Sequence, residues 1–157
     1  NMHTNPIEEA EAIIQNFPNK PEIFFHNEDK AYYSPSRDII SLPAKESFKI
    51  LEDFYQTMFH ESCHSTGHSS RLNRKGVNEK NRFGSEAYSK EELIAELGAA
   101  FLCAESGIVN KIINRSSAYL QSWLQVLKAD PRMIINAGQG AEKAAKYILN
   151  RKEEWKY

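Results

Sequence analysis

His60-Glu61-Ser62-Cys63-His64 is an HExxH motif, and it predicts both a metal site and a general base. On a helix, residues four apart lie on the same face one turn apart, so the two imidazoles can bind one ion. The glutamate between them would lie beside that ion and could take a proton from a water molecule. The motif therefore predicts a metal-assisted hydrolase built on His60, Glu61 and His64.

The residues around the motif favour a helix. The segment from Ser47 to Phe59 contains no Gly or Pro, and Gly67 follows as the residue type that commonly ends a helix. The histidines and Glu61 fall beside an apolar stripe, so one flank can be buried while the other faces a cleft. The stripe expected in the core consists of Phe48, Leu51, Tyr55, Phe59 and Cys63.

A catalytic zinc usually has three protein ligands, so one more must come from outside the motif. A helix expected over Ser89–Leu102, with Ser89 as its N-cap, carries Glu92 and Glu96 on one face beside buried apolar residues. One carboxylate could bind the metal while the other holds a ligand histidine by its second ring nitrogen. We assign Glu92 as the ligand and Glu96 as the orienting residue, with the reverse assignment left open. His68, just after the motif, is an alternative donor.

Two stretches of the chain resemble a known family. HESCHSTGHSSRLNR (60–74) and YSKEELIAELGAAFLCAE (88–105) are similar to the C-terminal zincin-like metallopeptidase domain of ArdC-type antirestriction proteins and related polyvalent proteins of plasmids, phages and integrative elements. The likeness extends over nearly the whole chain. It implies a gluzincin-like fold in which HExxH and a later glutamate bind Zn²⁺, with Glu92 as that glutamate in the pattern ExxAE. Ser65 departs from the family, which often has an aromatic residue there.

The same resemblance bears on domain organisation. Members of that family usually have a separate N-terminal domain that binds single-stranded DNA, and nothing in this chain corresponds to it. A chain of 157 residues is long enough for one domain with a substantial core. We expect residues 1–157 to form a single zincin-like domain, the C-terminal part of a longer antirestriction-type protein, and Asn1 before Met2 suggests a cut-out fragment.

The composition excludes several other classes of protein. Lys and Arg number 20 against 21 Asp and Glu, which gives a net charge of −1, whereas nucleic-acid-binding domains are normally basic. Cys63 and Cys103 lack the spacing of a disulfide framework, so we expect reduced, buried thiols. No apolar run approaches the roughly 20 residues that span a bilayer, and no signal peptide precedes the first helix. We expect a cytoplasmic protein with a peptide or protein substrate and no direct nucleic-acid or membrane binding.

The predicted elements change in type along the chain. After a helix at 6–14, three short β-type runs at 22–26, 31–33 and 38–42 predict a small antiparallel sheet. Everything later is helical, ending with helices near 116–128 and 131–150. This order predicts an α+β, zincin-like fold. Residues 38–43 are also expected to form an edge strand beside the cleft, to which an extended peptide could pair.

Residues 69–87 have no clear periodicity and carry several basic side chains. One interpretation is a flap that steers an acidic substrate. The favoured one is a solvated loop with Arg71 bound to a nearby carboxylate. His68, Tyr88 and Tyr119 are candidates to donate a hydrogen bond to the oxyanion of a reacting carbonyl, and the sequence does not choose among them.

These features predict a zinc metallopeptidase that serves the antirestriction or DNA-transfer function of a mobile element. Glu61 would be its general base, and His60, His64 and Glu92 would hold the metal. The rival hypothesis is a non-catalytic module with a zincin fold that blocks a host nuclease or binds DNA-processing proteins.

Overall fold

The structure is a computed structural model and describes residues 5–108, 121–128 and 130–151. Its elements are α1 (Pro6–Gln15), β1 (Glu22–His26), β2 (Tyr32–Ser34), β3 (Ile39–Pro43), a 3₁₀ turn (Lys45–Ser47), α2 (Leu51–Ser65), α3 (Lys75–Asn78), α4 (Glu86–Ser106) and α6 (Pro131–Leu149), and residues 121–127 are also helical. The predicted α+β class and the helices at 6–14 and 131–150 are confirmed. Of the helix predicted near 116–128, residues 116–120 lie outside the described part of the chain.

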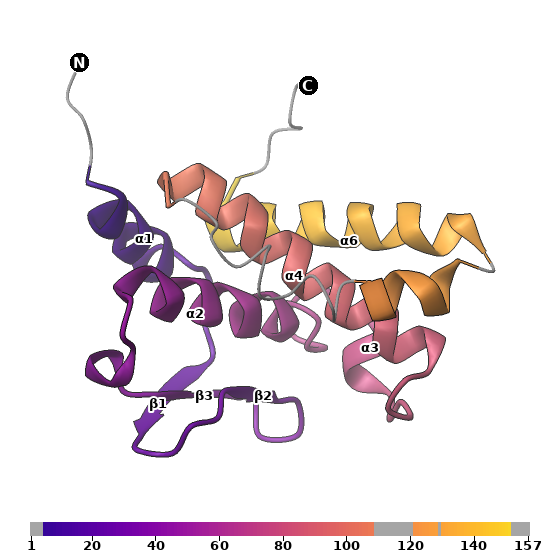
Figure 1. The fold of residues 1–157 in the computed structure, drawn as a ribbon, viewed down its shortest axis with the longest axis horizontal. Coiled ribbons are helices and arrows are strands. Elements are labelled where there is room, and N and C mark those ends of the chain that lie inside the picture. The colour runs from indigo at the N-terminus through magenta and orange to yellow at the C-terminus, as the bar shows by residue number, and fades with distance from the viewer. Residues whose placement is uncertain (1–4, 109–120, 129, 152–157) are drawn as a thin grey trace.

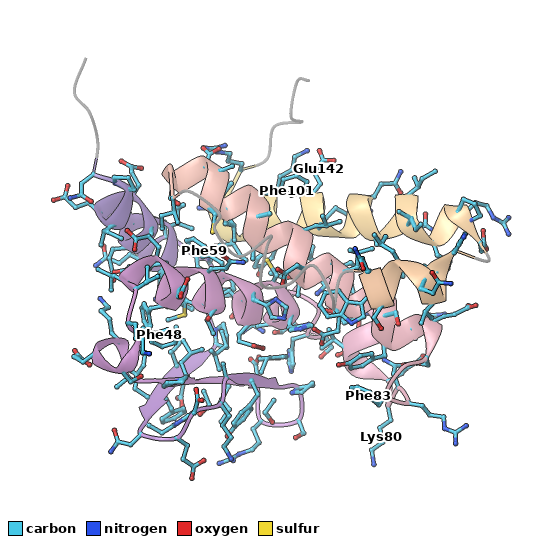
Figure 2. The ribbon with its side chains drawn as sticks, viewed as in Figure 1. Phe48, Phe59, Lys80, Phe83, Phe101 and Glu142 are labelled. Atoms are coloured by element: carbon cyan, nitrogen blue, oxygen red, sulfur yellow. The ribbon has the colours of Figure 1, made fainter. Side chains whose placement is uncertain are left out.

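Helix α2 lies between the sheet and the other long helices (Figure 1). The sheet runs along one side of α2, α4 packs on the other side, and α6 covers α4. Because α2 is covered on both sides, Tyr55, Phe59 and Cys63 are fully buried, as the apolar stripe predicted. Figure 2 shows Phe59 within this layered core. Leu51, at the first position of α2, is 37% exposed instead.

The three strands are ordered β1-β3-β2, with β3 in the centre. β2 and β3 are antiparallel, but β1 and β3 are parallel, so the prediction of an antiparallel sheet is wrong for β1. The most apolar strand occupies the centre because it gains most from burial: Ile40 and Leu42 are fully buried, whereas Phe24 of β1 is exposed. Ile39, Ile40 and Ser41 have strand neighbours on both sides, so this part of β3 has no free edge for a peptide, and β2 is the edge strand on that side.

Two helix starts differ from those expected. Helix α2 begins at Leu51, after a 3₁₀ turn at Lys45–Ser47 and an extended Ile50. Helix α4 begins at Glu86, and the Ser85 side chain accepts a hydrogen bond from the backbone N–H of Tyr88. Ser85 is therefore the N-cap, and Ser89 lies inside the helix, which starts about one turn earlier than predicted. Within the described residues, no helix is both long and apolar enough to cross a membrane.

Helices α2 and α4 approach closely at Gly98. A Cβ atom added there would lie 2.6 Å from Sγ of Cys63, which is well inside van der Waals contact. Cys63 and Cys103 are both free and buried, as expected. Glycine at position 98 thus sets how near α4 can lie to the helix that carries the HExxH motif.

The basic segment between α2 and α4 is better ordered than its lack of periodicity suggested. It contains α3, and two arginines tie it to the body of the protein. Arg71 binds both carboxylate oxygens of Asp38, at 2.8 and 3.0 Å, as the favoured interpretation anticipated. Its side chain is 1% exposed. Arg74 makes the second of these contacts, with Glu91 of α4.

Candidate metal centre

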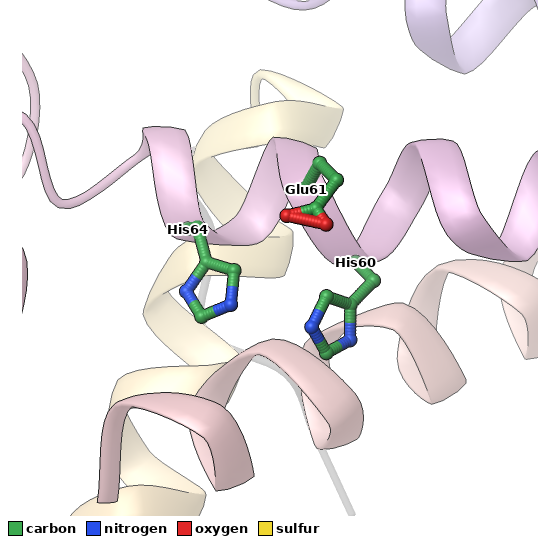
Figure 3. A group of neighbouring side chains, drawn as sticks. All are labelled: His60, Glu61 and His64. Atoms are coloured by element: carbon green, nitrogen blue, oxygen red, sulfur yellow. The ribbon is translucent and has the colours of Figure 1, made fainter. Parts of the chain in front are cut away.

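Helix α2 presents the two motif imidazoles toward α4, and Glu61 lies beside them on the same helix (Figure 3). The rings of His60 and His64 have centroids 4.9 Å apart. His60, Glu61 and His64 each offer one donor atom, and these three atoms lie within 4.8 Å of one another. The motif is on a helix and its side chains converge, as the spacing predicted.

Glu92 of α4 faces both imidazoles. Its Oε2 lies 3.4 Å from Nε2 of His60, and its Oε1 lies 3.3 Å from Nε2 of His64. Donor atoms bound tetrahedrally at the usual zinc distances are separated by about 3.4 Å. Each of the two contacts, which are made by different oxygens of Glu92, is close to this value, so the two imidazoles and the carboxylate are placed as ligands to one divalent ion would be.

Each of the two histidines also contacts a second carboxylate, at its Nδ1 atom. Nδ1 of His60 lies 3.1 Å from Oε2 of Glu96, and Nδ1 of His64 lies 2.7 Å from Oε2 of Glu91. A carboxylate at Nδ1 favours the tautomer that leaves Nε2 free to act as a ligand. Glu96 therefore lies at Nδ1 of His60, and Glu91 has the equivalent position for His64.

Glu91 was missed by sequence reasoning, which considered only the pair on one face, Glu92 and Glu96. Its two oxygens accept hydrogen bonds from Nε and Nη2 of Arg74, at 2.8 and 3.1 Å. Arg74 also donates to Oγ1 of Thr66 and to the carbonyl oxygen of Cys63. The only signal for this network was the run of adjacent acids at 91 and 92, which puts a second carboxylate on a buried part of the helix.

The close packing around Glu91 also explains a glycine. A Cβ atom at Gly76 would lie 3.2 Å from Cβ and 3.3 Å from Oε1 of Glu91. Helix α3 can therefore cover Glu91 closely because residue 76 has no side chain.

The charges of these groups stabilise one another. Burial lowers the pKa of His60, but its hydrogen bonds with Glu92 and Glu96 outweigh that effect and raise the pKa to about 9. The pKa of His64 is likewise raised, since contacts with Glu91 and Glu92 outweigh burial. Burial raises the pKa of Glu92, but both histidines hold it below its usual range. A metal ion would thus compete with protons at the two histidines.

The motif opens into a cleft of about 440 Å³. One wall comes from β2 and the turn after it, and the other from α3, the following loop and the start of α4. Glu61 lines this cleft although it is only 7% exposed to solvent. The lining residues are Ala31, Tyr32, Tyr33, Pro35, His60, Glu61, His64, Gly76, Val77, Glu79, Asn81, Tyr88, Glu91 and Glu92.

The remaining candidate residues are dispersed. Tyr88 lines the cleft, whereas His68 and Arg71 do not. Nδ1 of His68 lies 2.8 Å from the Ser70 hydroxyl, and the guanidinium of Arg71 is bound to Asp38. Tyr119 lies outside the described residues.

Residues 8–140 match the model of a family described as a zincin-like metallopeptidase. Among solved structures, the antirestriction protein ArdC of plasmid R388 matches in its Mn(II)-bound form, with 38% identity and a TM-score of 0.75 over 94% of this chain. The metal-free form of ArdC matches with 36% identity and a TM-score of 0.70 over 96% of this chain. A DNA primase TraC of Escherichia coli is 42% identical over 121 residues, or 77% of this chain.

This chain spans only part of each relative. It covers 52% of the Mn(II)-bound ArdC chain, 53% of the metal-free chain and 11% of the primase. The similarity therefore concerns one portion of larger proteins.

Proposed function

The chain belongs to the zincin-like metallopeptidase family, and on that premise we propose that it hydrolyses peptide bonds with the help of a bound metal ion. The observation that carries the proposal is the position of Glu92. Its carboxylate lies 3.3 to 3.4 Å from the Nε2 atoms of both motif histidines, at the separation expected of ligands to one ion.

The chain's own residues divide the work in a consistent way. His60, His64 and Glu92 would hold the ion, while Glu96 and Glu91 would fix the orientation of the two imidazoles. Glu61 takes the proton of the attacking water and passes it to the nitrogen of the leaving amine. Tyr88 lines the same cleft, whereas His68 does not, so we propose Tyr88 as the donor of a hydrogen bond to the oxyanion.

When bound, the metal polarises the scissile carbonyl and makes water more acidic. Two histidines and one glutamate are a known catalytic zinc set, so we propose Zn²⁺. The Mn(II)-bound form of ArdC makes manganese the second ion to test.

The cleft also suggests how a substrate would lie. β2 pairs only with β3 among the described residues, and its Tyr32 and Tyr33 line the cleft. An extended peptide could therefore add to the outer edge of β2, next to the metal ligands. This replaces residues 38–43 as the proposed peptide-binding strand.

The names of the relatives suggest the setting. One is the antirestriction protein of a plasmid and another is a DNA primase, so we propose that this domain serves the antirestriction or DNA-transfer function of a mobile element. The same names support the alternative, because neither names a protease. In that alternative the fold binds a host nuclease or a DNA-processing protein without cleaving it.

Metal analysis combined with a proteolysis assay tests the proposal. Metal content is measured after loading with Zn²⁺ or Mn²⁺, and turnover is followed with fluorescein-labelled casein. We expect Glu61→Gln to keep the metal and lose about 10²- to 10⁴-fold in turnover. We expect His60→Ala and Glu92→Ala to lose both, and Glu96→Ala to lower metal affinity about 10- to 100-fold.

The exposed Glu46 provides a matched control, since Glu46→Ala should change neither property. Equal metal loss in Glu61→Gln and His60→Ala would contradict the assigned roles. A wild-type chain that holds metal but cleaves nothing would favour the non-catalytic alternative.

A further inference from the structure

Phe83 is the most exposed large apolar residue in the described part of the chain. It is 89% exposed, compared with 49% for Phe24 and 55% for Phe25. Figure 2 shows Phe83 and Lys80 projecting from the tip of the loop between α3 and α4. A single exposed apolar side chain is common on protein surfaces, so its meaning depends on its surroundings.

The loop holds Phe83 in a defined place. The backbone N–H of Ser85 donates to the carbonyl of Arg82 at 3.0 Å, and Gly84 has a φ of 79°. This is the pattern of a type II turn, in which the third residue needs a positive φ and glycine supplies it. The next residue, Ser85, is the N-cap of α4, so the turn is anchored directly to the helix that carries Glu92.

The loop is also anchored on its other side. The Asn81 side-chain amide donates to the carbonyl of Gly76 at 2.7 Å, which ties the loop to α3. Phe83 is therefore presented by a short turn with fixed ends, and its exposure does not result from a loose segment.

Phe83 continues an aromatic surface that begins in the cleft. Its ring centroid lies 5.0 Å from that of Tyr88, and Tyr88 lines the cleft together with His60 and Glu61. Tyr32 and Tyr33 line the same cleft from β2. A peptide that lies along the cleft would thus meet tyrosines from β2 and from α4, and Phe83, which does not itself line the cleft, lies next to Tyr88.

We propose that Phe83 is a specificity residue, which binds a large apolar side chain of an extended polypeptide whose backbone lies between β2 and the 79–85 loop. The substrate would then be a polypeptide segment with an exposed or unfolded aromatic, leucine or methionine residue near the bond to be cleaved. This inference rests on the proposed function, because it takes the cleft to be the place where a peptide lies.

A binding measurement tests the inference separately from catalysis. The probes are fluorescein-labelled ten-residue peptides of identical sequence except for one central residue, which is Phe, Leu or Ala. Their affinity is measured by fluorescence anisotropy on zinc-loaded Glu61→Gln, with and without Phe83→Ala. We expect the Phe peptide to bind about tenfold more tightly than the Ala peptide, and Phe83→Ala to reduce that ratio to less than about twofold.

Phe24→Ala is the matched control, because Phe24 is an exposed phenylalanine on β1 that, unlike Phe83, makes no ring contact with Tyr88. It should leave the ratio unchanged. The inference is overturned if Phe83→Ala preserves the preference for the Phe peptide, or if Glu61→Gln shows no preference. If the preference depends on Phe83 while the wild-type chain cleaves no peptide, the inference stands and the proposed catalysis fails.

Discussion

The guanidinium of Arg74 donates hydrogen bonds to both carboxylate oxygens of Glu91, from Nε to Oε1 at 2.8 Å and from Nη2 to Oε2 at 3.1 Å. Glu91 in turn lies 2.7 Å from Nδ1 of His64, so the segment after α2 is coupled to one of the two motif histidines. Burial raises the pKa of Glu91, but His64 and Arg74 outweigh burial and keep the carboxylate charged. A residue ten positions beyond the motif thus helps to orient a proposed metal ligand.

Arg74→Lys should weaken metal binding. A lysine cannot bridge both oxygens of Glu91 and also reach Thr66, so Glu91 would hold His64 less firmly. We expect metal affinity to fall about tenfold, measured by competition with a chelating indicator. Arg71→Lys is the control, because Arg71 is another buried arginine of the same segment but binds Asp38 instead. Equal metal affinities in the two variants would argue against this role for Arg74.

The stability contributed by Asp38 should depend on pH. Burial raises its pKa, but hydrogen bonds from Arg71 and Tyr33 outweigh burial and lower it below the ordinary 3.8. A lowered pKa in the folded state means that the contribution is full above the ordinary pKa and is lost as the pH falls through the folded one. Asp38→Asn should therefore cost about 1.5 to 3 kcal/mol at neutral pH and much less at low pH.

Urea unfolding of wild type and Asp38→Asn, at about pH 6 and about pH 2.5, measures this change. Asparagine suits the site because residue 38 has a φ of 51°, which asparagine tolerates. The exposed Asp29 serves as a control, since Asp29→Asn should stay within about 0.5 kcal/mol of wild type. A pH-independent cost of Asp38→Asn would refute the assignment.

Gly98→Ala should loosen the contact between α2 and α4. The added methyl group would overlap Sγ of Cys63, so α4 would have to move and carry Glu92 with it. We expect a loss of about 1 to 3 kcal/mol in the free energy of unfolding, together with weaker metal binding. Gly138→Ala on α6 meets no atom within 4 Å and should instead stabilise the protein by about 0.5 to 1 kcal/mol. Thermal and urea unfolding distinguish the two.

The true start of α4 can be tested with two serines. Ser85 caps the helix, so Ser85→Ala should destabilise the chain by about 1 kcal/mol. The buried Ser89 hydroxyl has no hydrogen-bond partner among the described residues, so Ser89→Ala should be neutral or slightly stabilising. Urea unfolding of both variants decides between them, and a larger loss for Ser89→Ala would restore the helix start predicted from the sequence.

Much of the proposed site follows from local sequence. An α-helix repeats every 3.6 residues, so the spacing within HExxH and between Glu92 and Glu96 places those side chains on common faces before any tertiary contact forms. Helix α6 could also be predicted from local sequence, because Asp130 caps it and Pro131 occupies its first turn. These features depend on residues only a few positions apart.

Tertiary packing determined the rest. β3 is the central strand because its apolar side chains are buried best between two neighbouring strands. The sequence of a short strand does not reveal which other strands it pairs with. The sequence predicted Ser89 as the cap of α4, whereas the structure has Ser85, which directly follows the turn at Gly84. Glu91 and Arg74 meet because α3 folds back over α4, which brings together side chains 17 positions apart. The sequence by itself therefore determined which side chains share a helix face, while the tertiary structure decided which faces meet, because long-range contacts depend on how separate elements pack.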